Sequence, residues 1–298
     1  VRGGVVVSGV VFAAGAGIGF GLFQAVNRRA NQAMDAYRAT FLLLLVGSAS
    51  MALFSLFTRD LSSLQVGSPR AFLFFAGAGI VHFFLGWTFL SLSQQQVGAA
   101  TTGAVLGSTP LIGSILAAVV LGESLRPLTA VGILLAATGV TLLSLRRSST
   151  LERRVPWFAL GAAASWGSSP LFIRWGLRDL DDPIIGVTFG LLAATFAYAI
   201  ALFMARRARS ADPVSREGLA WVTLAGVMVA ACIALQWIAF DRIAIAIAIT
   251  VMQLSAPTVV TVAPLLVKSD AEKPTLPMLL GMAAVLAGSV VVVLSGTG

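Results

Sequence analysis

Charge is the scarcest property of this 298-residue sequence. Charged residues make up 11% of the chain, against about 25% in a typical soluble domain, whereas apolar residues make up 58%. The length alone would allow two soluble domains, but this composition excludes them. The net charge of +8 does not indicate nucleic-acid binding, because the basic residues stand in short segments between apolar runs.

Cysteine and histidine are also nearly missing. The single cysteine, Cys232, excludes a disulfide within the chain and a thiolate metal site. No cluster of His, Cys and carboxylate residues has the spacing of metal ligands, and no G-x-x-x-x-G-K-[ST] motif indicates ATP hydrolysis. No serine has a buried base with an orienting carboxylate. We therefore expect no metal, no cofactor and no enzymatic activity.

Carboxylates are absent from the middle of the apolar runs. All twelve acidic residues stand in or beside the connecting segments. A carboxylate in the middle of a membrane is a functional site by default, because its burial is costly. Its absence here argues against cation or proton exchange at such a residue.

Long apolar runs are the main feature of the sequence. A hydrocarbon core of about 30 Å requires about 20 helical residues, and ten runs approach or exceed that length. They are residues 5–26, 40–57, 71–92, 99–121, 128–145, 156–176, 184–205, 218–240, 248–267 and 276–295. We therefore predict an all-α integral membrane protein with ten transmembrane helices.

The runs also occur as two similar sets of five. Equivalent features recur at offsets of 147 to 149 residues: Ser108-Thr109-Pro110 with Ser255-Ala256-Pro257, Asp35 with Asp182, and Glu123, Gly132 and Gly139 with Glu272, Gly281 and Gly288. This register predicts two repeats, residues 1–147 and 154–298. Because five is an odd number, the second repeat would insert upside down, which gives inverted five-helix repeats typical of secondary transporters.

These residues resemble a known family. The stretch from Val97-Gly98-Ala99-Ala100 to Ser108-Thr109-Pro110-Leu111, then Leu121-Gly122-Glu123, Gly132 and Gly139, is similar to the EamA-type domain of the drug/metabolite transporter superfamily. The second half matches more loosely, since Lys268-Ser269-Asp270-Ala271-Glu272 replaces the compact Gly-Glu turn.

The resemblance implies a ten-helix transporter with two EamA domains that works by alternating access. It implies that the first, third, fourth, sixth, eighth and ninth spans line a central cavity. Small multidrug exporters of the superfamily use a membrane-embedded glutamate, which is not visible here. The resemblance does not identify a substrate.

Five polar or aromatic side chains inside the runs are candidates for substrate binding. They are His82, Trp87, Trp166, Gln236 and Gln253. His82 is the only residue within the runs that titrates near neutral pH, and an amide or indole could bind a neutral or zwitterionic solute. Each could instead make an ordinary hydrogen bond or packing contact between helices.

Pro110 and Pro257 are candidate hinges. Each removes a helical hydrogen bond near the middle of a span, and proline-interrupted helices at corresponding positions of two repeats mark a binding site or pivot in transporters. We expect both broken helices to share one polar space with the candidate binding residues.

The function predicted from these features is secondary transport, with export, of a small neutral or zwitterionic, amino-acid-like metabolite. Drug efflux and flipping of a lipid-linked substrate are the alternatives. We expect the partners to be a small-molecule substrate and membrane lipids but no nucleic acid, the location to be the inner membrane of a bacterium, and the assembly to be a monomer, with a dimer as the alternative. Seven basic residues fall on the side of the termini and thirteen on the other, which favours external termini, whereas related transporters mostly place theirs in the cytoplasm.

Overall fold

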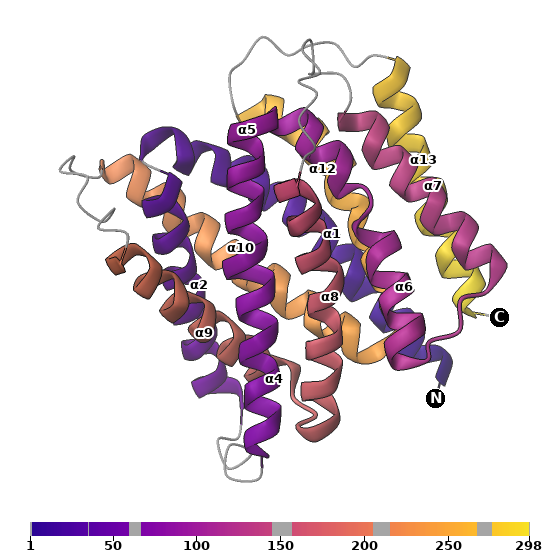
Figure 1. Cartoon of the computed structure of the whole chain (residues 1–298), viewed down its shortest axis with the longest axis horizontal. Helices are drawn as coiled ribbons and strands as arrows, with labels where there is room; N and C mark the ends of the chain where they lie inside the picture. Colours follow the sequence, from indigo (N-terminus) through magenta and orange to yellow (C-terminus); the bar gives the residue numbers. More distant parts are fainter. Residues whose placement is uncertain are drawn as a thin grey trace.

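The computed structural model describes residues 2–34, 36–59, 67–144, 157–204, 215–266 and 276–297. Over these ranges the chain is helical and contains no strand (Figure 1). The helices are α1 (Arg2–Ala33), α2 (Ala36–Thr58), α4 (Pro69–Gly79), the π-helix η1 (Ile80–Leu85), α5 (Gly86–Leu106), α6 (Thr109–Leu121), α7 (Pro127–Ser144), α8 (Trp157–Asp179), α9 (Pro183–Met204), α10 (Arg216–Arg242), α11 (Ile245–Val251), the 3-10 turn η4 (Met252–Leu254), α12 (Ser255–Leu266) and α13 (Leu276–Thr297).

Seven described helical segments are long and apolar enough to cross a membrane. They are Gly4–Asn27, Tyr37–Thr58, Pro69–Ser93, Pro183–Met204, Arg216–Arg242, Ile245–Val262 and Leu276–Ser295. The corresponding predicted spans are confirmed, with ends that differ by at most five residues. Two further apolar helices, Thr109–Leu121 and Pro127–Leu143, are shorter, and α8 carries Arg174 and Arg178 near its end. The chain is therefore a multi-pass membrane protein.

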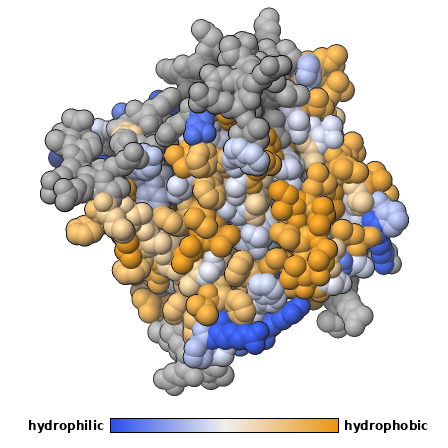
Figure 2. All heavy atoms as spheres, viewed as in Figure 1, coloured by the Kyte–Doolittle hydropathy of each residue, from blue (hydrophilic) through white to orange (hydrophobic). Residues whose placement is uncertain are grey.

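Large apolar side chains cover the outside of the bundle. Phe57, Phe203 and Val119 are 85%, 84% and 78% exposed, and Figure 2 shows apolar residues spread across the visible face with hydrophilic residues toward its edges. This distribution fits lipid as the solvent, because hydrocarbon does not drive apolar side chains inward.

The segment α5 contains a chain reversal. The hydroxyls of Ser93 and Thr102 lie 2.7 Å apart, although nine residues of a straight helix would separate them by about 13.5 Å. The chain therefore folds back between these residues, as Figure 1 shows at the upper end of α5. This reversal separates the predicted third and fourth spans.

The two halves of the chain interleave. The most extensive contacts of α1 are with α10, those of α7 are with α13, and α4 and α5 both pack on α8. Close glycine contacts hold α7 against α13. A Cβ on Gly132 would lie 2.8 Å from the Gly288 carbonyl oxygen, and a Cβ on Gly139 would lie 2.7 Å from the Gly281 carbonyl oxygen. Backbones that approach this closely are typical of helix pairs in membranes.

Candidate functional site

The helix that carries His82 changes its winding around this residue. Residues Ile80–Leu85 form a π-helical turn, and the Gly86 amide bonds to the carbonyls of Val81 and Phe83. The His82 carbonyl is therefore bypassed, because in an α-helix it would accept from Gly86. Single π-turns inside α-helices are frequent at functional sites.

Trp166 satisfies the bypassed carbonyl. Its indole Nε1–H donates to the His82 carbonyl oxygen over 3.0 Å, and the centroids of the two rings lie 6.1 Å apart. Gly86 makes this approach possible, since a Cβ there would lie 2.4 Å from Trp166 Nε1. The structure thus brings two of the predicted binding residues together.

Ser169 holds the His82 ring. Its hydroxyl lies 2.7 Å from His82 Nδ1, and Ser169 itself is completely buried. The next residue, Pro170, lies inside α8. We call His82, Gly86, Trp166, Ser169 and Pro170 the His82 cluster. Sequence reasoning missed Ser169, although its place in the Gly167-Ser168-Ser169-Pro170 segment beside Trp166 was an available signal.

An aromatic row continues from His82 to the first helix. The Phe83 ring lies 4.6 Å from His82 and 5.5 Å from Trp87, measured between centroids. Trp87 stacks on Phe23 of α1 at 6.4 Å. The predicted residue Trp87 therefore connects the His82 cluster to α1.

The two predicted glutamines lie on other helices. Gln236 of α10 is buried, and its Nε2 lies 3.6 Å from the Met252 sulfur. Its Oε1 is buried without a hydrogen-bond partner among the described residues. Gln253 is half-buried in η4, the next residue after Met252. The described contacts do not join either glutamine to the His82 cluster, so their common role in binding stays a prediction.

Both predicted hinge prolines stand immediately after a break in a helix. The turn at Gly107 and Ser108 ends α5, and Pro110 occupies the first turn of α6. The 3-10 turn η4 ends at Leu254, and Pro257 occupies the first turn of α12. This placement agrees with proline's preference for the first turn of a helix. Movement at these breaks stays a prediction.

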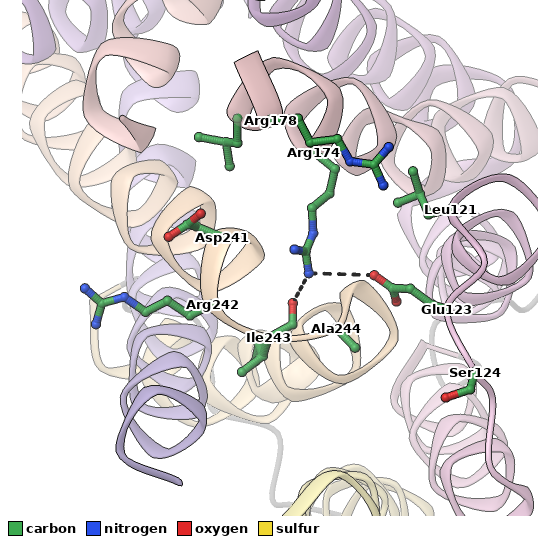
Figure 3. A pocket seen from close by; sticks show the side chains of 10 residues that line it. Leu121, Glu123, Ser124, Arg174, Arg178, Asp241, Arg242, Ile243 and Ala244 are labelled. Carbon is green, nitrogen blue, oxygen red and sulfur yellow. Dashed lines mark hydrogen bonds and ion pairs between the residues drawn. The ribbon is translucent and has the colours of Figure 1, made fainter. Parts of the chain in front are cut away.

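A pocket opens where α6, α8 and α10 end, on the side of the molecule where Figure 1 places both termini. Its volume is about 530 Å³. Figure 3 shows Arg174 reaching from α8 toward Glu123, which follows α6. The Arg174 guanidinium lies 3.7 Å from Glu123 Oε1 and also donates to the Ile243 carbonyl oxygen.

Glu123 binds the backbone on the other side of the same pocket. Its two carboxylate oxygens lie 3.2 and 3.0 Å from the amide nitrogen of Ile245, which begins α11. We call Glu123, Arg174 and the backbone of Ile243 and Ile245 the latch. The sequence singled out Glu123 as part of a Gly-Glu turn but gave no indication that Arg174 would meet it.

The His82 cluster, in the middle of the helices, consists of uncharged side chains, whereas the latch at the helix ends is charged. In the part of the chain that the structure describes, no three His, Cys, Asp or Glu residues could hold a metal ion. The described carboxylates, Glu123 among them, lie at helix ends or in connections. The His82 cluster can therefore offer hydrogen bonds and aromatic surface to a solute, but not a carboxylate.

Comparisons with known proteins agree with this picture. The model of the EamA-like transporter family matches residues 7–145. A solved structure described as "Crystal structure of protein" has 22% sequence identity and a TM-score of 0.75, and the match covers 95% of this chain and 97% of that one. This likeness shows the same fold over nearly the whole chain. No curated protein sequence matches the chain. The resemblance found in the sequence is confirmed: residues 7–145 match the EamA-like transporter family.

Proposed function

We propose that this protein is a secondary transporter that exports a small neutral or zwitterionic metabolite across the inner membrane of a bacterium. The observation that carries the proposal is the His82 cluster. It places an imidazole and an indole, without a carboxylate, between helices of the two halves of the chain. Uncharged polar groups beside an aromatic surface suit a solute with no net charge.

We propose further that the chain forms ten membrane spans as two inverted repeats. The glycine contacts between α7 and α13 support this arrangement, since they are reciprocal. Gly132 meets Gly288, and their equivalents Gly281 and Gly139 meet in the same way. A two-fold relation between the repeats requires this pairing.

A second contact supports the two-fold relation. The hydroxyls of Ser48 on α2 and Thr195 on α9 lie 2.6 Å apart, and these residues are 147 positions apart in the sequence. That is the offset between Pro110 and Pro257. In a two-fold arrangement, equivalent residues touch each other where the symmetry axis passes between them, so this contact supports the proposed relation.

Alternating access is the mechanism that we propose for these repeats. The latch ties the end of α6 to α8 and to the start of α11, so it closes the bundle on the side of the termini. Opening this side requires the ion pair to separate. The symmetry of the repeats then provides an equivalent opening on the other side.

Drug efflux and flipping of a lipid-linked substrate are the competing functions. Efflux of a lipophilic cation would be favoured by a carboxylate in the middle of a span, and the described spans place none there. A flippase requires a lateral opening to lipid, whereas the pocket beside Glu123 and Arg174 lies at helix ends. Metabolite transport therefore has the better support.

A screen of solutes with protein in liposomes tests the proposal. Uptake of amino acids and other small neutral metabolites would be measured, together with the thermal shift that each solute produces in the purified protein. Trp166→Ala should abolish uptake, because it removes the indole that contacts His82. Trp157→Ala is the matched control, since Trp157 is 71% exposed at the start of α8. Uptake that persists in Trp166→Ala would contradict the proposed site.

A further inference from the structure

We propose that Ser169 and Pro170 fix His82 in the neutral tautomer that carries its proton on Nδ1. The Nε2 atom is then a hydrogen-bond acceptor, so the site takes a solute group with an N–H or O–H donor, such as an ammonium or hydroxyl group. The inference rests on the proposed function for the solute, but the tautomer itself is a property of the empty protein.

Pro170 leaves the Trp166 carbonyl without its usual helical donor. In a regular helix the amide of residue 170 would donate to the carbonyl of Trp166. Proline has no amide hydrogen, so it leaves that carbonyl free. The Ser169 hydroxyl lies 3.4 Å from the Trp166 carbonyl oxygen and can supply the missing donor.

The Ser169 hydroxyl links the Trp166 carbonyl to the imidazole of His82. Its side chain is completely buried, and among the described residues its oxygen contacts only the Trp166 carbonyl and His82 Nδ1. A hydroxyl has one proton to donate. If that proton serves the carbonyl, then Nδ1 must donate to the serine oxygen across the short distance of 2.7 Å. The reverse arrangement would leave the carbonyl without a donor among the described residues.

The other ring nitrogen is free to meet a solute. His82 is half-buried, and Nε2 has no hydrogen-bond partner in the described part of the chain. It is also not among the described polar atoms that are both sealed and unpartnered, in contrast to Gln236 Oε1. With the proton on Nδ1, this nitrogen presents a lone pair. Trp166 and Phe83 flank the ring, so an apolar part of the same solute could lie against them.

Nuclear magnetic resonance of the single histidine tests the tautomer directly. His82 is the only histidine in the chain, so ¹⁵N-labelled histidine yields one imidazole signal set from the whole protein. In mildly alkaline buffer without solute, we expect a protonated Nδ1 and an unprotonated Nε2. A protonated Nε2 would overturn the proposal, whether or not Nδ1 is also protonated.

Substitutions on α8 test the cause. Pro170→Ala restores an amide donor for the Trp166 carbonyl and frees the Ser169 hydroxyl to donate to Nδ1. We expect the ratio of the tautomers to move toward protonated Nε2 by about fivefold, which corresponds to one ordinary hydrogen bond. Ser169→Ala should move the ratio in the same direction, because Nδ1–H loses its acceptor. Ser168→Ala is the matched control, since its hydroxyl bonds to the Ser165 carbonyl at 3.3 Å.

The outcomes separate this inference from the proposed function. An unchanged ratio in both Pro170→Ala and Ser169→Ala would overturn the role of these residues, even if the protein transports metabolites. A shifted ratio in a protein that transports no metabolite would support the tautomer and contradict the proposed function.

Discussion

Removing the charge of Glu123 should open the side of the bundle that carries the termini. Glu123→Gln keeps a side-chain oxygen for the Ile245 amide but loses the ion pair with Arg174. Arg174 would then keep its bond with the Ile243 carbonyl. We expect the closed state to lose stability relative to a state in which α6 and α8 separate at this end.

The magnitude follows from the geometry of the pair. At 3.7 Å and an effective dielectric constant of about 20, the attraction is about 4.5 kcal/mol before desolvation is subtracted. The side chains of Arg174 and Glu123 are 25% and 16% exposed, which places the pair between a surface ion pair of under about 1 kcal/mol and a buried one of about 3 to 5 kcal/mol. A loss of about 1 to 2 kcal/mol changes the ratio of closed to open states by about 5- to 30-fold.

Spin labels can measure this change. Labels at Ser124 and Arg178, both exposed on the rim of the pocket, would report the distance between the ends of α6 and α8 in a Cys232→Ala background. The Glu123→Gln variant should gain a population at longer distance, and adding Arg174→Gln should add only the loss of the bond to the Ile243 carbonyl, because the ion pair is already lost.

The control is a glutamate outside the latch. Glu217→Gln removes a charge from the first turn of α10, where Glu217 accepts from Trp221 Nε1 at 3.3 Å. Its distance distribution should match that of the parent protein. An unchanged distribution in Glu123→Gln, with transport at the parent rate, would show that the latch is a static contact and would refute the reasoning.

Three further predictions concern packing, hinges and coupling. Gly139→Ala should lower the free energy of unfolding by about 1 to 3 kcal/mol, since its Cβ would meet the Gly281 carbonyl oxygen at 2.7 Å. Thermal unfolding in detergent measures this loss. The control Gly4→Ala should leave the midpoint unchanged, because its Cβ would have no atom within 4 Å. Pro110→Ala and Pro257→Ala should shift the balance between the inward-open and outward-open states in opposite directions. Distances between spin labels on the loops that stay as in the parent protein in both variants, with normal transport, would show that the prolines only serve packing. His82→Gln should abolish any response of transport in liposomes to a pH gradient, and an equal response before and after the change would exclude His82 as the coupling site.

The sequence by itself determined that the chain is a helical membrane protein. Apolar runs of about 20 residues can lie in lipid only if their backbone groups bond within the run, and a helix meets that requirement without a partner. The limits of α9 and α13 were therefore predictable to within one or two residues. The family match over residues 7–145 confirmed the resemblance seen in the Gly-Glu turn at Glu123.

The equivalence of Gly132 and Gly139 with Gly281 and Gly288 was also visible in the sequence, because duplication preserves spacing. The contacts between these glycines could not be predicted. A small residue permits close approach but does not determine which helix packs against it. The reciprocal contacts appear only when α7 and α13 are packed together.

The site depended most on the tertiary structure. His82 and Trp166 stood out in the sequence as polar or aromatic residues inside apolar runs. Their contact, and the roles of Ser169 and Arg174, depend on the rotation of each helix about its axis and on a π-turn that offsets the residues after it. Hydropathy carries no information on either, because lipid-facing and protein-facing sides of these helices are both apolar. Only the packed structure shows that Ser169 reaches His82 across 87 residues of sequence, and that Arg174 closes one end of the bundle on Glu123.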